Sequence, residues 1–521
     1  MDRLFIGLDI STQSAKLVLL NWAVGDLVYE DSLNYDLDLP HYGTRNGVIY
    51  NPDNSVSESD PKMWIEAVEF LFRRLKENSI PLSQVKSISV SGQQHGLVAL
   101  DKEGNLSRPS SKLWNDFSTQ MECDLLEDNI GGRSKMIQEV GNSQRTGYTA
   151  SKIYNIFLNE RDAYDKTSAF LLVHNFINWY LTGGVIAMEE GDASGMALWD
   201  PVKKLWSDSV VNSIDIGLRA KLPNVDSSKK SIGFISESLA KEFGFSHDCT
   251  IDSGSGDNMY GAVGTGNIAP GLVTISLGTS GTAYTFLENP FVDPSGEIAC
   301  FCDSTGNYLS LLCVSNMANG YNSFLKQNSL SHSDFDLLLG KSEPGNNGKI
   351  IVPWFEGERT PDLPDAVPIF FGFDPASLNK KTIARGLLEG HVQNLYDGFK
   401  RLPVKPQKIH LTGGMSKSRS WRQAIADIFS CRTIPLESEG AAMGAALHAA
   451  WVWHNENQEP KEINEIVEPF IFINEQLICE PREEYQKIYR NQSKLFSSLS
   501  KRVRGQDSED PFKLFHGMIK Q

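Results

Sequence analysis

The chain has 521 residues, of which 40% are hydrophobic and 22% are charged, a balance typical of globular proteins. Because a single hydrophobic core stops growing at about 250–300 residues, this length predicts more than one domain. The formal net charge of −16 argues against nucleic acid or a membrane surface as a partner, and no stretch approaches the roughly 20 apolar residues of a membrane helix.

The amino-terminal residues do not form a signal-peptide pattern, because Asp2 is acidic and a β-rich run follows at once, so we expect a cytoplasmic protein. Residues 5–20 contain two β-rich runs around a tight polar turn, which predicts a hairpin with small residues at its tip. Residues 272–286 repeat this pattern. Two such hairpins indicate two related halves of the chain.

Helix and strand signals alternate through the remainder of the chain. Asp60 before Pro61 is typical of a helix start, with apolar residues recurring on one face afterwards. Further expected elements are a strand at 85–91, a buried helix at 171–181, a strand at 408–412 followed by a helix, an Ala-rich helix at 441–453, an amphipathic helix at 483–500 and a solvated segment at 501–510.

The chain has no Walker motif, since Phe335 occupies the position of the glycine that should precede Gly340-Lys341-Ser342. Phosphates can also be bound by turns of small residues whose N–H groups converge on the anion. Residues 9–13 and 276–282 form two turns of this kind. Either turn alone could be an ordinary hairpin, but the pair favours phosphate binding. Asp9, beside the first turn, could hold Mg²⁺ or its water.

Asp257 is the candidate catalytic base. It lies in the segment Ser253–Asn258, where glycines would let a substrate approach the backbone. Phosphoryl transfer to a hydroxyl needs an acceptor for the alcohol proton, and Asn258 could orient a neighbouring hydroxyl. The alternative is a glycine-rich turn with a capping aspartate.

Two further loops could bind a sugar, which needs hydrogen bonds and an apolar surface. Gln94 and His95 follow the expected strand at 85–91, and Trp114 adds an aromatic face. His95 could instead be a structural histidine, and Trp114 a core residue. Residues 413–418 lie between a strand and a helix, where a nucleotide base could lie against bare backbone. An ordinary strand–helix turn is equally compatible with that segment.

Taken together, the motifs resemble those of the FGGY carbohydrate kinases, in the superfamily of actin and the heat-shock chaperone ATPases. The resemblance covers about residues 4 to 455. Any one motif is unspecific, whereas the ordered set is specific. In chain order the motifs are GLDISTQSAK, SGQQHG, LWND, DASGM, SGDN, SLGTSGT, LTGGMSKS and EGAAMGAALHA.

The resemblance implies an α/β fold of two RNase H-like (actin-like ATPase) domains with an active-site cleft between them. It divides the chain into a sugar-binding N-terminal domain (1–265), an ATP-binding C-terminal domain (266–455) and a helical extension (456–521). It also implies a small-molecule sugar and ATP as ligands, Mg²⁺ as cofactor, and a monomer or homodimer.

The implied reaction is phosphorylation of D-xylulose to D-xylulose 5-phosphate, with L-ribulose, another ketopentose or a polyol as alternative acceptors. A non-catalytic nucleotide-binding scaffold is the alternative from another class. The segment Gly357–Pro361 resembles the corresponding segment of bacterial members of the family. His332 stands where some relatives have a tryptophan that packs against the nucleotide base. The implied roles are Asp257 as base, Gln94, His95, Asn258, Asp257, Arg145 and Trp114 for the sugar, Asp9 and Asp257 for the metal, and Thr12, Gln13, Gly278, Thr279, Ser280, Gly413, Gly414, Met415 and Ser418 for ATP.

Overall fold

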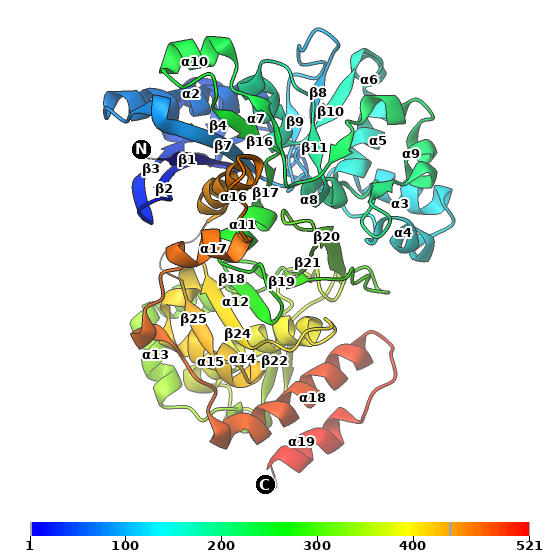
Figure 1. The fold of residues 1–521 in the computed structure, drawn as a ribbon. Helices are drawn as coiled ribbons and strands as arrows, with labels where there is room; N and C mark the ends of the chain where they lie inside the picture. The colour runs from blue at the N-terminus through cyan, green and yellow to red at the C-terminus, as the bar shows by residue number, and fades with distance from the viewer. Residues whose placement is uncertain (1–2, 437–439, 520–521) are drawn as a thin grey trace. The chain divides into compact units, whose positions relative to one another are not determined.

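The computed structural model describes residues 3–436 and 440–519 and is shown in Figure 1. The chain forms two compact units, and neither is a single continuous segment. The predicted division into residues 1–265, 266–455 and 456–521 follows sequence motifs and stays a prediction. By contacts, unit 1 comprises Met1–Ile268, Phe286–Leu309 and Ser438–Ile471, and unit 2 comprises Ala269–Thr285, Ser310–Glu437 and Phe472–Gln521.

A mixed sheet forms the centre of unit 1. Its strand order is β15-β16-β7-β1-β2-β3, and β17 also pairs with β7. The hairpin of β1 and β2 is antiparallel, whereas β7 is parallel to β1 and to β16. The strands are β1 (Leu4–Ile10), β2 (Ser14–Asn21), β3 (Asp26–Asn34), β7 (Val85–Gly92), β15 (Ser231–Phe234), β16 (Thr250–Asp252) and β17 (Ser255–Gly256).

Small residues let two helices approach this sheet and each other closely. Helix α16 (Ala441–Glu456) contacts β1, and a Cβ atom on Gly7 would lie 1.9 Å from the carbonyl oxygen of Ala442. Helix α11 (Asp257–Gly264) packs on α16, where a Cβ atom on Gly444 would lie 1.8 Å from the carbonyl oxygen of Tyr260. Larger side chains would therefore separate α16 from β1 and from α11.

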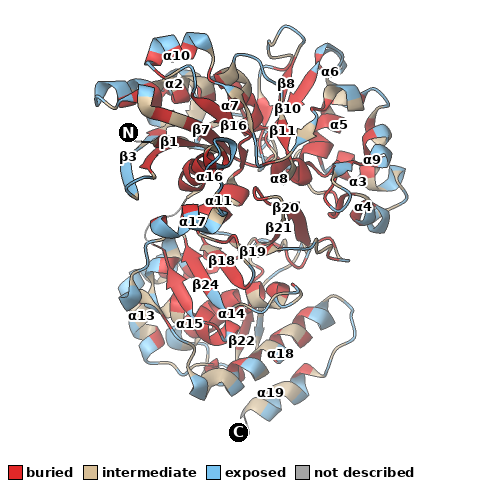
Figure 2. Ribbon diagram, in the orientation of Figure 1, coloured by how far each residue is buried: buried red, intermediate tan, exposed pale blue. Residues whose placement is uncertain are grey.

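The remaining helices of unit 1 enclose two apolar cores. Helix α2 (Pro61–Glu77) buries Trp64, Val68, Leu71 and Leu75, and the Asp60 side chain accepts from the Lys62 amide, as the sequence predicts. Figure 2 shows the buried residues concentrated on the strands and on the inner faces of the helices. The others are α1 (Tyr35–Asp38), α3 (Gln120–Asn129), α4 (Arg133–Val140), α5 (Thr149–Asn159), α6 (Arg161–Lys166), α7 (Val173–Thr182), α8 (Glu190–Ala193), α9 (Asp208–Ile214), α10 (Glu237–Phe243) and α17 (Ile463–Val467).

Unit 2 contains the second predicted hairpin, in a sheet whose strand order includes β21-β19-β18-β24-β25. As in unit 1, the first two strands of the repeat are antiparallel and a later strand is parallel to the first. The predicted repeat and the α/β fold are therefore confirmed. These strands are β18 (Leu272–Leu277), β19 (Gly281–Leu287), β21 (Tyr308–Val314), β24 (Lys408–Thr412) and β25 (Thr433–Pro435).

Helices cover the second sheet and continue towards the carboxyl terminus. The predicted amphipathic helix is α18 (Gln486–Val503), which extends three residues past the predicted end at Ser500, and a further helix, α19 (Pro511–Ile519), was not predicted. The last family motif begins at residue 439, outside the described residues, and continues into α16. Among the described helices, none is both long and apolar enough to span a membrane. The other helices are α12 (Asn319–Asn328), α13 (His332–Gly340), α14 (Lys380–Phe399) and α15 (Arg419–Phe429).

Candidate active site

Asp9 lies near the end of β1, and its carboxylate accepts hydrogen bonds from two serine hydroxyls. Ser11 Oγ donates to Oδ2 at 2.5 Å, and Ser91 Oγ donates to Oδ1 at 2.7 Å. The parallel register of β1 and β7 sets Ser91 opposite Asp9. Burial raises the pKa of the Asp9 carboxyl, and the two hydroxyls oppose that rise. The predicted metal-site carboxylate is therefore fixed at the point where β1 and β7 end.

Three of the predicted sugar-site residues form one hydrogen-bonded cluster. Asn258 Nδ2 donates to Gln94 Oε1 at 2.8 Å and to Asp257 Oδ1 at 3.0 Å. Strand β17 pairs with the end of β7 and brings Asp257 to this position as the first residue of α11. The N-cap of α11 is Gly256, so Asp257 is not its capping residue.

The environment of Asp257 changes its acidity. Its pKa is raised to about 7, first because burial disfavours the charged carboxylate, and further because Asp9 and Asp192 are negative neighbours. The backbone N–H groups of Asn258 and Gln94 oppose this rise. A pKa near neutrality suits a general base, because both protonation states are accessible at working pH.

The interpretation of Trp114 as a core residue is wrong. The side chain is 40% exposed, and its indole Nε1 donates to Thr12 Oγ1 at 2.9 Å. Thr12 Oγ1 donates in turn to Gln93 Oε1 at 3.1 Å, which connects the first predicted phosphate turn to the predicted sugar loop. Gln13 is exposed at the tip of the same turn.

His95 has a backbone φ of 67°, in the left-handed region that few non-glycine residues adopt. Its ring centroid lies 4.7 Å from that of Tyr148, and its carbonyl oxygen accepts a 2.6 Å hydrogen bond from Lys152 Nζ. Lys152 is fully buried, and burial lowers its pKa to about 7 against the opposing pull of Asp116. The contact of Lys152 with His95 could not be predicted from the sequence, because the lysine lies in an otherwise ordinary amphipathic helix.

Arg145 makes its contacts elsewhere in unit 1. Its Nη2 donates to the carbonyl oxygen of Gly296 at 3.0 Å, and its Nε donates to Ser143 Oγ at 3.4 Å. Neither contact connects it with Asp257 or Gln94. Its role in sugar binding stays a prediction.

Two buried acids behind the cluster were not among the predicted site residues. Asp192 Oδ1 accepts from Gln94 Nε2 at 3.3 Å, and Asp192 Oδ2 lies 3.2 Å from Nδ1 of His174. Glu189 accepts from the Asp192 amide at 2.7 Å, and burial raises the pKa of Glu189 to about 7. Asp192 stands within the DASGM motif, but burial of a carboxylate is not visible in a sequence.

In unit 2 the turn between β18 and β19 exposes Gly278, Thr279 and Ser280. The Gly278 amide donates to the Ser280 carbonyl oxygen at 3.1 Å, which closes the turn. The carbonyl oxygen of Thr279 accepts two 3.0 Å hydrogen bonds, from the amides of Met317 and Ala318. The predicted nucleotide turn is therefore held from the segment that precedes α12.

Glu358 fixes that segment. Its carboxylate is buried and accepts from the Ser315 amide at 2.6 Å, from Asn316 Nδ2 at 3.0 Å and from Asn394 Nδ2 at 2.8 Å. Asn316 Nδ2 also donates to the carbonyl oxygen of Gly357 at 2.6 Å. Residues 315–318 thus connect the segment Gly357–Pro361 to the turn at Thr279. No role for this segment could be predicted from the sequence.

The second glycine-rich segment of unit 2 follows β24. Gly413 has a φ of 80°, and a Cβ atom there would lie 2.7 Å from the carbonyl oxygen of Leu277, so this turn requires glycine. Gly414 is exposed, Met415 is half-buried, and Ser418 is the N-cap of α15, accepting from the Trp421 amide at 3.5 Å. Their part in adenosine binding stays a prediction.

Comparison with known proteins covers both halves of the chain. The N-terminal domain of the FGGY family of carbohydrate kinases matches residues 4–264, and the C-terminal domain of that family matches residues 273–453. The chain belongs to the FGGY family of carbohydrate kinases. It is therefore an ATP-dependent sugar kinase of the actin-like ATPase type.

Individual relatives of this FGGY kinase extend over nearly its full length. A xylulose kinase of Haemophilus influenzae is 34% identical over 501 residues, which cover 94% of this chain and 97% of the relative. The crystal structure of xylulose kinase from Bifidobacterium adolescentis is 27% identical with a TM-score of 0.78, covering 94% of this chain and 99% of that one. Gluconate kinase from Lactobacillus acidophilus has a TM-score of 0.85 at 22% identity, covering 96% and 98%, which shows a shared fold alone.

Magnesium normally accompanies ATP in such kinases. The described part of the chain holds no group of three or more His, Cys, Asp or Glu side chains arranged for a metal ion. Mg²⁺ that is shared with phosphates needs only one or two protein carboxylates and keeps several waters. Asp9 and Asp257 are close enough for one charge to raise the pKa of the other, and as a pair they fit this requirement.

Proposed function

We propose that this kinase transfers the γ-phosphoryl group of ATP to the terminal hydroxyl of D-xylulose, with Asp257 as general base. The observation that carries the chemistry is the cluster of Asp257, Asn258 and Gln94, in which Asp257 has a pKa of about 7. The choice of sugar is supported by relatives named xylulose kinase, from Haemophilus influenzae and Staphylococcus epidermidis, that are 34% and 30% identical to this chain.

In this proposal the sugar hydroxyl gives its proton to Asp257 while its oxygen attacks the γ-phosphorus. An oxygen–phosphorus bond forms to the sugar, the bond to the β,γ-bridging oxygen breaks, and ADP leaves. Gln94, His95 and Asn258 bind sugar hydroxyls, with Trp114 and Arg145 as further contacts. The side-chain amide of Asn258 donates to Gln94 Oε1 and to Asp257 Oδ1. It can therefore align a bound hydroxyl with the base.

The phosphates of ATP are assigned to backbone donors and hydroxyls, because the overall charge of −16 provides no attraction for an anion. In unit 1 these are Thr12 and Gln13, and in unit 2 the exposed turn Gly278–Ser280. Residues 413–418 would contact adenosine. Asp9 and Asp257 would hold Mg²⁺, which would neutralise charge on the transferring phosphoryl group.

A coupled assay of ADP release tests the sugar. We expect kcat/KM for D-xylulose to exceed that for L-ribulose and for pentitols by about tenfold or more, since a misplaced hydroxyl leaves polar groups of the site unpaired. A higher kcat/KM for another acceptor would reject D-xylulose as the substrate. It would leave the assignment of Asp257 untouched, because that assignment is tested by substitution. Cytoplasmic location and a monomeric or homodimeric state stay predictions.

A further inference from the structure

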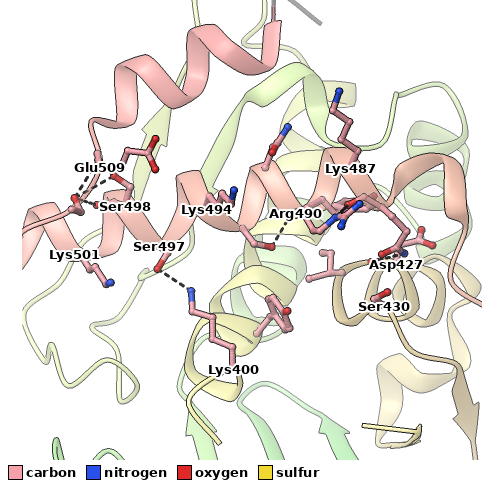
Figure 3. Close-up of a pocket in the computed structure, with 17 residues that line it drawn as sticks. Lys400, Asp427, Ser430, Lys487, Arg490, Lys494, Ser497, Ser498, Lys501 and Glu509 are labelled. Carbon is pink, nitrogen blue, oxygen red and sulfur yellow. Dashed lines mark hydrogen bonds between the residues drawn. The ribbon is translucent and has the colours of Figure 1, made fainter. Parts of the chain in front are cut away.

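A groove of about 860 Å³ runs along α18 in unit 2, between this helix, the end of α14 and the end of α15. Figure 3 shows Lys400 reaching from α14 towards Ser497 on α18. Five cationic side chains and two acidic ones line the groove. This excess of positive charge is notable in a chain whose net charge is −16.

The cations of α18 follow one helical stripe. Arg490, Lys494, Ser497 and Lys501 are spaced by four, three and four residues, so they lie on the same face of the helix. Lys400 lies opposite this stripe, and its Nζ donates to Ser497 Oγ at 2.9 Å. Lys400 therefore adds a hydrogen-bond donor to the groove from a second element, while the unpaired positive charge comes from α18.

Most of these cations have no acidic partner in the described part of the chain. Arg490, Lys494 and Lys501 form no ion pair there, whereas Lys400 is paired with Asp397 at 2.5 Å. Of the two lining acids, Asp427 is buried and already bonded to Arg482, through Nη2 at 2.6 Å and Nε at 3.1 Å, so it does not neutralise the stripe. The other, Glu509, forms no ion pair within residues 3–436 and 440–519.

The groove is preformed, because buried contacts fix α18 on α14. Tyr489 Oη donates to Glu389 Oε1 at 3.0 Å, and Gln492 Nε2 donates to Glu389 Oε2 at 2.7 Å. Leu495 and Leu499 add apolar packing against the core beside β22 (Ile350–Val352). A ligand would thus meet cationic side chains that extend from a helix whose backbone is already held in place.

We propose that this groove binds a small anion carrying at least two phosphate groups. Along the helix axis Arg490 and Lys494 are about 6 Å apart, and Lys494 and Lys501 about 10 Å apart, so one ligand can contact two cations through separate phosphates. Guanidinium and ammonium groups, together with neighbouring serine hydroxyls, commonly donate hydrogen bonds to phosphate oxygens in proteins. The volume suits a small ligand, and the acidic charge elsewhere on the chain would repel a long polyanion.

Tripolyphosphate is the probe, and hydrogen exchange of the full-length kinase gives a local readout. The nucleotide site would also bind this probe, so exchange at residues 486–503 is followed separately from exchange at residues 276–282. We expect tripolyphosphate to slow exchange in both segments, and inorganic phosphate to have a weaker effect at 486–503. The triple variant Arg490→Gln, Lys494→Gln and Lys501→Gln should bind at least about tenfold more weakly at 486–503 and normally at 276–282.

The matched control removes three exposed lysines of unit 2 that do not line the groove, by Lys380→Gln, Lys381→Gln and Lys513→Gln. It changes the net charge by the same amount and should retain protection of residues 486–503. Unchanged kinase activity without the probe establishes that both variants fold. Each of three results would overturn the proposal: no protection of 486–503 in the unaltered protein, equal weakening in the control, or binding of long-chain polyphosphate only.

Discussion

The ammonium group of Lys152 donates a 2.6 Å hydrogen bond to the backbone carbonyl oxygen of His95. Thr149 Oγ1 donates to the same oxygen at 3.4 Å. Since the φ of His95 is 67° and Lys152 is fully buried, this contact holds an uncommon backbone conformation in the predicted sugar loop. Lys152 is thus placed to position His95, whose part in sugar binding is a prediction.

Replacing Lys152 by methionine tests this inference. The Lys152→Met variant leaves the His95 carbonyl without its principal donor, at a cost of about 1–3 kcal/mol in a buried setting. We expect KM for the sugar to rise about tenfold, with a smaller change in kcat and in KM for ATP. Steady-state kinetics measure this split. The exposed control Lys102→Met should behave as the unaltered enzyme, and equal changes in both KM values would contradict a local role.

Asp257→Asn removes the proton acceptor while keeping the size of the side chain. We expect kcat to fall by about 10²–10⁴-fold, the usual loss for a general base. Calorimetric titration with D-xylulose should still detect sugar binding, because Gln94 and His95 remain. Asp248→Asn changes an exposed aspartate of the same unit and should leave kcat unaltered. Near-normal turnover of Asp257→Asn would reject the base assignment.

The pH dependence of kcat/KM reports the same group in the free enzyme. Burial raises the pKa of Asp257 to about 7, so below that pH the carboxyl is protonated and cannot accept the hydroxyl proton. We expect kcat/KM to fall about tenfold for each pH unit below 7 and to level off above it. Rates measured from pH 5 to pH 8 at constant ionic strength check this. A profile that is flat down to pH 5 would contradict the raised pKa.

Glu358→Gln tests the support of the turn at Thr279. The carboxylate now accepts hydrogen bonds from Ser315, Asn316 and Asn394. The NH₂ group of a glutamine would face at least one of these donors, and that hydrogen bond would be lost. Segment 315–318 should then hold Thr279 less firmly, with a loss of about 1–3 kcal/mol in stability. We expect KM for ATP to rise several-fold while KM for the sugar stays constant. Glu356→Gln, two residues away and exposed, is the control, and an effect confined to the sugar would exclude this role.

Much of this architecture could be predicted from local patterns. The two hairpins are visible because alternating β-rich runs around small-residue turns are a property of neighbouring residues. The start of α2 follows from Asp60 and Pro61, which act within one helical turn. The sequence was enough to predict Asp9, Asp257 and the turn Gly278–Ser280 as site residues, because each lies within a short motif of neighbouring residues. Helix α19 was not predicted. The strongly polar residues 501–510 indicate a solvated segment and carry no signal that a helix follows.

Residue types in a fixed local order were enough to predict the family, the two-part α/β organisation and the kind of chemistry. Which residues act together could be seen only once the chain was folded. Gln94 and Asn258 are 164 positions apart, and Lys152 is 57 positions from His95, yet each pair is hydrogen-bonded. Burial and neighbouring charge, which raise the pKa of Asp257 and lower that of Lys152, arise only when distant segments exclude water from the same place.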